Sequence, residues 1–165
     1  METLFVSKTI ELKRTKPELE KAFNVKIDIK GKQVTIDGEA VNEFEASHIV
    51  EAIGFGFSTK KALLLKDPEY TFRRIRIKDF TRRKNLEDVR ARIIGKEGKS
   101  KKTIEDISGV YLELNKNEVG LIGPTEDIEQ ETAALTNLIK GTKHANVYKK
   151  LEKINAEKKK HQFIK

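Results

Sequence analysis

The stretch "RIIGKEGKSKKTIEDISG", residues 92–109, decides how this sequence is interpreted. Its triplet Gly98-Lys99-Ser100 matches the last three positions of a phosphate-binding P-loop. It also contains Gly95-Lys96-Glu97-Gly98, a glycine pair of the kind with which some small domains hold single-stranded RNA. Both hypotheses place a polyanion against backbone N–H groups at the start of a helix. They imply different proteins, an NTPase or an RNA-binding module.

The NTPase hypothesis fails at one position. The P-loop pattern GxxxxGK[ST] requires a glycine where this sequence has Ile93, which is followed by Ile94. Two adjacent β-branched residues resist the positive φ that such a loop uses. We also recognise no pair of nucleophile and base and no cluster of metal ligands. The sequence therefore predicts a protein that is not an enzyme and that needs no cofactor or metal.

Positive charge is concentrated in two segments of this 165-residue chain, whose net charge is +8. Residues 70–104 contain 13 basic and 4 acidic residues, and residues 141–165 contain 8 and 2. The intervening residues 105–140 contain only 2 basic and 8 acidic residues. Because the first basic segment includes the glycine pair, the charge favours a nucleic-acid site there.

The remaining composition indicates the expected compartment. The chain has no cysteine, which excludes disulfides and cysteine-based zinc sites and fits a reducing environment. The N-terminus is too charged for a signal peptide, and no apolar run is long enough to cross a bilayer. We therefore expect a soluble cytoplasmic protein that has no membrane partner.

The sequence repeats itself with an offset of 85 residues. Leu19–Gly38 lies without gaps over Ile104–Gly123, and the apolar positions of both segments coincide up to a shared closing glycine. Each copy predicts an alternating strand, at Val25–Ile29 or Val110–Leu114, then a tight turn, a second strand and an amphipathic helix. Two strand alternations and a helix in one register indicate a duplicated α+β unit.

The elements in front of the two copies differ. In the second copy, a strand within residues 70–80 and a helix at Leu86–Ile94 lead into the glycine pair. The first copy is expected to begin with a strand at about Leu4–Leu12 and a short helix at Pro17–Phe23. Its residues equivalent to the glycine pair are Ile10–Lys13, which include no glycine. We predict domains at residues 1–68 and 69–148 and a basic C-terminal tail at residues 149–165.

The order β-α-GxxG-α-β-β-α resembles a eukaryotic-type, or type I, KH domain. The wider chain is similar to the archaeal Partner-of-Nob (Dim/Krr-type) family of small-subunit ribosome assembly factors. Two further stretches carry this resemblance, "HIVEAIGFGFSTKKAL" at residues 48–63 and "GTKHANVYKKLEK" at residues 141–153. The chain departs from the family in its first unit, which lacks the glycine-containing loop that members often keep.

The resemblance implies two type I KH-like units (β-α-α-β-β-α) in tandem, of which the second binds single-stranded RNA. The implied target is the 3′-end region of small-subunit ribosomal RNA during ribosome maturation. The implied protein partners are a PIN-domain rRNA endonuclease and the alpha subunit of initiation factor two.

The candidate site follows from the residues around the glycine pair. Glycines have no Cβ, so a sugar–phosphate backbone can approach the peptide N–H groups closely. Nearby cations would contact phosphates. An apolar floor for the bases would be formed by Ile94 and the strand containing Leu112. We expect one of Ile93 and Ile94 to be buried and the other to face this groove. The predicted RNA-binding residues are Arg90, Arg92, Ile94, Gly95, Lys96, Glu97, Gly98, Lys99, Lys101, Lys102 and Leu112.

An alternative function stays open. Because the first unit lacks the glycine loop, the alternative is a protein-interaction scaffold that links a processing nuclease or a translation initiation factor to the small subunit. Phe55, Phe57 and the run Leu63–Leu65 are the candidate contacts for such partners.

Overall fold

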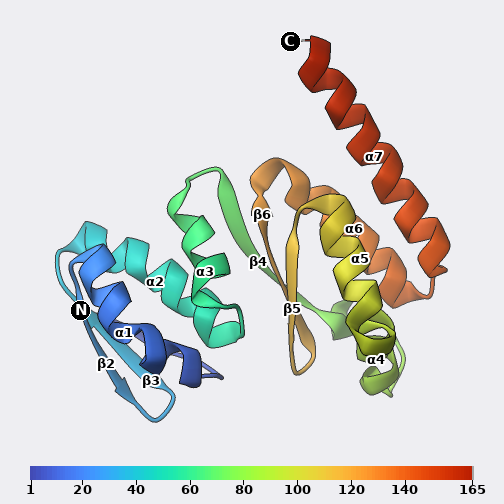
Figure 1. Cartoon of the computed structure of the whole chain (residues 1–165). Helices are drawn as coiled ribbons and strands as arrows, with labels where there is room; N and C mark the ends of the chain where they lie inside the picture. Colours follow the sequence, from blue (N-terminus) through green and yellow to red (C-terminus); the bar gives the residue numbers. More distant parts are fainter. Residues whose placement is uncertain (165) are drawn as a thin grey trace. The chain divides into compact units, whose positions relative to one another are not determined.

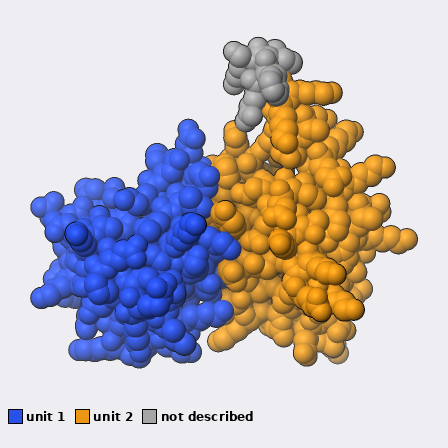
Figure 2. All heavy atoms as spheres, viewed as in Figure 1, with its two compact units in different colours: residues 1–72 blue, residues 73–165 orange. Residues whose placement is uncertain are grey.

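The chain forms two compact units, Met1–Phe72 and Arg73–Lys165 (Figure 2). The computed structural model describes residues 1–164, with the backbone alone for residues 162–164. Each unit combines helices with a three-stranded sheet, so the fold is mixed α+β, as predicted. In the described part of the chain, no helix has the length and apolar character needed to span a bilayer.

The sheet of the first unit has the strand order β1-β3-β2, with antiparallel pairing throughout (Figure 1). Ile27 lies opposite Ile36 in this sheet, and both side chains are buried. The elements are β1 (Glu2–Phe5), α1 (Ile10–Phe23), β2 (Lys26–Lys30), β3 (Gln33–Asp37), α2 (Ala40–Phe55), α3 (Thr59–Ala62) and the 3-10 helix η1 (Leu63–Lys66).

The start of the first unit differs from the prediction. The strand ends at Phe5 instead of Leu12, and α1 begins at Ile10 and contains Pro17 within it. Leu12, Leu19 and Phe23 are the buried apolar residues of α1, and their spacing fits one helical face. Burial of this face stabilises the helix in spite of the proline, which costs about 3 kcal/mol inside a helix.

The second unit repeats this plan with an added helix in front. Its sheet has the order β4-β6-β5, so β5 is an edge strand, and β4 begins within the last residues of the first unit. The elements are β4 (Tyr70–Arg76), the 3-10 helix η2 (Ile77–Asp79), α4 (Leu86–Ile94), the 3-10 helix η3 (Lys96–Gly98), α5 (Lys99–Ser108), β5 (Tyr111–Asn115), β6 (Glu118–Pro124), α6 (Thr125–Lys140) and α7 (His144–Ile164).

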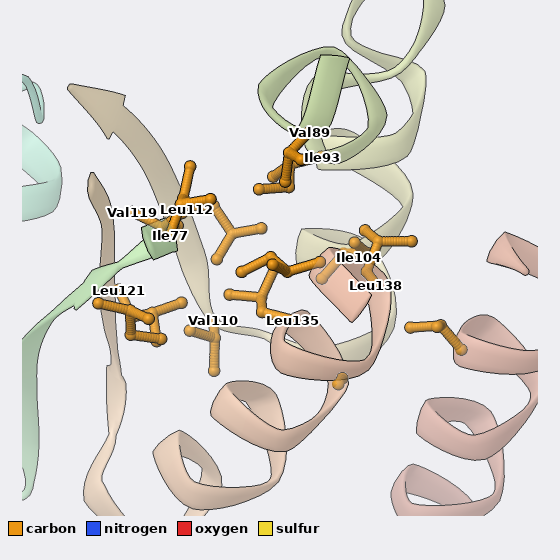
Figure 3. Packing of buried hydrophobic residues seen from close by; sticks show 14 of the residues in the cluster. Ile77, Val89, Ile93, Ile104, Val110, Leu112, Val119, Leu121, Leu135 and Leu138 are labelled. Carbon is orange, nitrogen blue, oxygen red and sulfur yellow. The ribbon is translucent and has the colours of Figure 1, made fainter. Parts of the chain in front are cut away.

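One hydrophobic core joins the sheet and the helices of the second unit (Figure 3). Val89 and Ile93, one helical turn apart in α4, meet Ile104 from α5 and Leu112 from β5 in this core. Full burial of each such side chain contributes about 1.5–3 kcal/mol. The short helices on both sides of the glycine pair are therefore fixed by the core.

Helix α7 runs from His144 to Ile164 and crosses residue 149, where the sequence analysis placed the start of a basic tail. Its residues Val147 and Leu151 are buried in the core of the second unit, and the helix packs against α5 and α6. The first turns of α7 thus belong to the packed body of this unit.

The internal repeat is visible in the backbone. Residues with positive φ recur at the predicted offset of 85 at three places, as do two glycines that each pack against a valine. The positive-φ pairs are Asn24 with Gly109, Gly31 with Lys116, and Gly56 with Gly141. Because backbone of this kind is restricted to few positions, its recurrence supports a duplicated unit independently of the apolar pattern.

The aromatic residues proposed as protein contacts lie in the interior. Phe55 and Phe57 are both buried, and their rings pack against each other and against Phe72, with centroid distances of 5.7–6.1 Å. The proposed role of these two side chains as surface contacts is therefore wrong. Leu63–Leu65 form η1 and are only half-buried.

Candidate nucleic-acid interface

The glycine pair forms a tight turn between α4 and α5. Gly95 ends α4 with φ 74°, and its N–H donates to the carbonyl of Ala91 at 2.8 Å. Glu97 and Gly98 also have positive φ, 56° and 76°, and Gly98 immediately precedes α5. A glutamate in left-handed backbone is strained, and such strain tends to be kept where a loop has a function.

The two glycines play different structural roles. A Cβ on Gly95 would lie 2.6 Å from both the backbone nitrogen and the Cβ of Ser100, so Gly95 is required by the chain's own packing. A Cβ on Gly98 would meet no atom within 4 Å. A ligand backbone therefore has open access at Gly98, whereas the corner at Gly95 is filled by Ser100.

Three of the predicted cations surround Gly98 and face solvent. Lys96, Lys99 and Lys102 are exposed, and none of them forms an ion pair with another described residue. Helix α5 starts with Lys99 and has no side-chain cap at Gly98, so its amide groups and positive dipole end point toward the same space. This arrangement attracts a chain of phosphates.

Arg90 and Arg92 are used within the protein. Arg90 Nη1 donates to Asn117 Oδ1 at 2.6 Å, which holds α4 to the turn between β5 and β6. Arg92 Nη2 donates to the carbonyl of Thr142 at 2.7 Å, and His144 Nε2 lies 2.8 Å from the carbonyl of Arg92. Their prediction as phosphate contacts does not fit these hydrogen bonds, which position the loop instead.

Lys101 also departs from its predicted role as a phosphate contact. Its ammonium group lies 3.4 Å from Glu105 Oε1 and 3.7 Å from Glu113 Oε1, so it spans the gap between α5 and β5. The second oxygen of Glu105 accepts the backbone N–H of Leu112 at 2.9 Å. A charged cluster thus lies between α5 and the edge strand β5, and the sequence analysis did not identify its members Glu105 and Glu113 as site residues.

The predicted apolar floor is only partly present. Ile94 is 38% exposed beside the loop while Ile93 is buried, which confirms that one of the two is available. Leu112 is 1% exposed and belongs to the core, so its prediction as an RNA contact is wrong. Strand alternation explains this, because Leu112 points inward while its neighbours Tyr111 and Glu113 do not.

Further exposed cations that were not predicted as site residues precede α4, at the end of this helix opposite the glycine loop. Arg82, Arg83 and Lys84 are exposed in the connection that leads into α4. Asn85 follows them and caps α4, with its side chain accepting the N–H of Glu87 at 3.2 Å. The signal for these residues was the run Arg82-Arg83-Lys84 directly before a helix start.

The equivalent region of the first unit is a helix with a buried contact. Residues Ile10–Lys13 form the first turn of α1, where Glu11 accepts hydrogen bonds from the N–H and the hydroxyl of Thr59 at 3.2 and 3.0 Å. Hydrogen bonds from Arg14, then from Thr59, lower the pKa of Glu11 to about 2. A carboxylate that stays ionised occupies this place, so the first unit offers no comparable phosphate site.

The described residues contain no group of three or more histidine, aspartate or glutamate side chains that could hold a metal ion. The candidate site consists of backbone amides, three exposed lysines, one exposed isoleucine and the charged cluster between α5 and β5. This set can bind a polyanion and contact bases.

A model of the eukaryotic-type KH domain (KH-domain type I) matches residues 71–156. A KH domain-containing protein of Methanocaldococcus jannaschii is 34% identical over 155 residues, covering 90% of this chain and 68% of that protein. The pre-rRNA-processing protein pno1 of Aspergillus fumigatus is 29% identical over 149 residues, which cover 86% of this chain but only 58% of that protein.

Solved structures show the same similarity. The Dim2p chain in a crystal structure of an a/eIF2alpha-aDim2p-rRNA complex from Pyrococcus horikoshii matches with a TM-score of 0.83 and 29% identity, over 94% of both chains. The residues matched by the KH model contain the whole loop and the helices on both sides of it. The chain therefore belongs to the PNO1/Dim2-type family of KH-domain proteins.

Proposed function

We propose that this protein binds single-stranded RNA and acts in maturation of the small ribosomal subunit, with the 3′-end region of small-subunit ribosomal RNA as its target. The observation that carries the proposal is the loop at Gly98, which is open to a ligand and surrounded by three lysines without ion pairs. The protein acts by binding and has no catalytic step of its own.

The binding mode follows from the side chains that remain available. One phosphate lies against Gly98 and the first amides of α5, and Lys96, Lys99 and Lys102 neutralise it and its neighbours. Bases extend from there toward Ile94 and the edge of β5. Arg90 and Arg92 support the loop from behind through their internal hydrogen bonds.

The relatives support the RNA target and suggest partners. The A. fumigatus relative is named a pre-rRNA-processing protein, and the P. horikoshii structure contains rRNA and a/eIF2alpha. We infer that this chain binds the alpha subunit of initiation factor two and a PIN-domain endonuclease in the cytoplasm. These partners would place the protein where the RNA end is cut and the subunit is prepared for translation.

We further propose two KH-like units in tandem, at residues 1–68 and 69–148, with a basic extension at residues 149–165. The first unit is a degenerate copy whose glycine loop has been replaced by the start of α1. Support comes from the positive-φ residues that recur at the offset of 85 and from Glu11 at the position of Lys96. In this proposal the second unit alone contacts RNA through a glycine loop.

A substitution at Gly98 tests the proposed function. Gly98→Asp places a negative charge where the phosphate is expected, and aspartate tolerates left-handed backbone better than most residues. Affinity for an oligonucleotide with the 3′-end sequence of small-subunit rRNA, measured by fluorescence anisotropy, should fall about tenfold to hundredfold.

Lys13→Asp is the matched control, because Lys13 is the exposed equivalent of Gly98 in the first unit. It should leave the affinity within about threefold of that of the unmodified protein, since the first unit has a helical turn in place of the glycine loop and exposed charges are screened by salt. Unchanged binding by a folded Gly98→Asp variant would refute the proposed site.

A protein-interaction scaffold remains a second candidate function because the first unit exposes large apolar side chains. Phe5 is 80% exposed at the edge of the sheet, and Phe44 is 63% exposed on α2 near the exposed Val41. Phe44→Glu should then reduce the recovery of protein partners from nuclease-treated extract without affecting RNA affinity. Loss of RNA affinity with intact partner recovery would contradict this assignment.

A further inference from the structure

A cluster of three charged side chains lies between α5 and the edge strand β5. Lys101 is 24% exposed, Glu105 13% and Glu113 27%, so the cluster is partly shielded but reachable from solvent. Lys101 follows Gly98 by three residues, which is about one turn of helix. Lys101 therefore lies within about one helical turn of a phosphate bound at Gly98, and its two carboxylate partners lie beside it.

The hydrogen bonds distinguish the roles of the three residues. Both oxygens of Glu105 are occupied, one by the N–H of Leu112 at 2.9 Å and the other by Lys101. Glu105 therefore positions Lys101. Glu113 lies 3.7 Å from the ammonium group, and no hydrogen bond to it comes from any residue in the described part of the chain. Glu113 and Lys101 thus offer a carboxylate acceptor and an ammonium donor side by side.

This pairing matches the Watson–Crick edge of guanine. Guanine presents two adjacent N–H donors, N1–H and the 2-amino group, beside the acceptor O6, so a carboxylate can accept both donors while an ammonium group contacts O6. Uracil has a single N–H between two carbonyl groups. Adenine and cytosine place an unprotonated ring nitrogen beside their amino group, and its lone pair would face the carboxylate.

We propose that Glu113 and Lys101 select guanine at one position of the bound RNA. This inference rests on the proposed function and adds base selectivity to it. Contacts to phosphate alone carry no sequence information, so a reader of base edges is needed for any preference. The partial burial of the cluster strengthens its charged hydrogen bonds relative to those in open water.

The first unit provides an internal control for the structural part of this cluster. Lys16, Glu20 and Asp28 stand at the equivalent positions, and Glu20 likewise accepts the N–H of Ile27 at 2.9 Å. That unit has a helix where the second has its glycine loop. If Glu113 had only a structural role, Asp28→Asn and Glu113→Gln would therefore have the same effect on the base preference of the protein.

The test uses the full chain and fluorescent uridine heptamers in which the central residue is uridine, guanosine, inosine, adenosine or cytidine. The protein should bind the guanosine heptamer about tenfold or more tightly than the others, with inosine weaker because it lacks the 2-amino group. Glu113→Gln should remove this preference, so that the guanosine and uridine heptamers bind the variant with affinities within about threefold of each other. Asp28→Asn should leave the preference unchanged.

Two results would overturn the guanine inference alone, and a third would overturn the proposed function as well. Equal affinity for all five heptamers means that no base is selected, although RNA is bound. A guanosine preference that survives Glu113→Gln assigns the selectivity to other residues. Absence of binding to every heptamer would overturn the inference together with the proposed function.

Discussion

The two units use one backbone plan for two purposes, and the clearest difference lies at Ile10–Lys13 and Gly95–Gly98. In the first unit these four residues are the first turn of α1, whereas in the second they form a turn that includes three residues with positive φ. The fold therefore forms without the loop. The backbone strain at Glu97, at a position where the first unit has an ordinary helical turn, is best explained by a ligand that binds to the loop.

A second difference lies in the cores. Position 131 is a glutamate on α6, only 1% exposed, whereas the equivalent residue on α2 is the buried Ala46. Burial, opposed by a hydrogen bond from the Ser108 hydroxyl and assisted by the nearby charge of Glu105, raises the pKa of Glu131 to about 8. The second unit thus contains a buried acid whose pKa is raised, whereas hydrogen bonds from the N-terminal ammonium group and from the N–H of Gly38 lower the pKa of the buried Glu43 in the first unit. The stabilities of the two units should therefore depend on pH in different ways.

The largest expected effect concerns this buried acid. Its pKa is 4.5 in the unfolded chain and about 8 in the folded one, so the folded state binds the extra proton between these values. The contribution of Glu131 to the free energy of unfolding should therefore be fully present below about pH 4.5, and about 3–5 kcal/mol of it should be lost as pH rises to 8. Urea unfolding at pH 5 and pH 8, followed by amide exchange in α6, measures the change.

Glu131→Gln is the control for this prediction, because it keeps the shape of the side chain and removes the titration. Its stability should change much less between the same two pH values. An identical pH dependence in the variant would show that other groups cause it, and the difference between Glu131 and Ala46 would then not explain it.

The next effect compares the stability cost of a substitution in the glycine turn of the second unit with that of one at the equivalent helical position of the first unit. Gly95→Ala introduces a Cβ that would lie 2.6 Å from Ser100 in backbone with φ 74°, so it should destabilise the second unit by about 2–4 kcal/mol. Thermal unfolding measures the loss. Ile10→Ala, at the equivalent exposed position of the first unit, should change stability by less than about 0.5 kcal/mol. Similar costs at both positions would contradict the different structures described for the two turns.

A third prediction concerns the hydrogen bond from a helix glutamate to an edge strand, which both units contain. Glu20 and Glu105 each accept the N–H of an edge-strand residue at 2.9 Å, so Glu20→Ala and Glu105→Ala should each cost about 1–2 kcal/mol. Hydrogen exchange at Ile27 and Leu112 should speed up in the corresponding variant alone. A strongly unequal pair of values would mean that the two edges are held in different ways.

The smallest effect is on the salt dependence of RNA binding. Lys99→Gln should lower the slope of log affinity against log salt concentration by about 0.7, because one phosphate contact is lost. Arg14, the equivalent residue in the first unit, already pairs with Glu11, and Arg14→Gln should leave the slope unchanged. A changed slope for Arg14→Gln would indicate that the first unit also contacts RNA.

The sequence predicted the repeat, the mixed fold and the loop because each leaves a local pattern. Alternation identified the strands, and helix α4 has the predicted bounds, Leu86–Ile94. The start of α1 was missed because the alternation through Ile10 and Leu12 resembles a strand, and only the packed unit shows that Leu12 belongs to a helical face.

The site was predicted less completely, and the reason is physical. Alternation along β5 gives two faces but does not say which one faces the core, so Leu112 was assigned to the wrong side. A basic residue near a loop counts equally in a charge pattern whether it is free or hydrogen-bonded internally. Asn117 and Thr142, which engage Arg90 and Arg92, lie 27 and 50 residues away in sequence, beyond any local pattern.

The carboxylates of α1 and α5 that accept amides of β2 and β5 also bear on how this chain avoids errors during synthesis. Two similar units in one polypeptide risk exchanging strands, because each unpaired edge suits the other copy's strands as well as its own. Glu20 and Glu105 each occupy an amide that an incoming strand would need. A misassembled sheet must first displace a charged group, so duplicated sequence and independent folding can coexist in one protein.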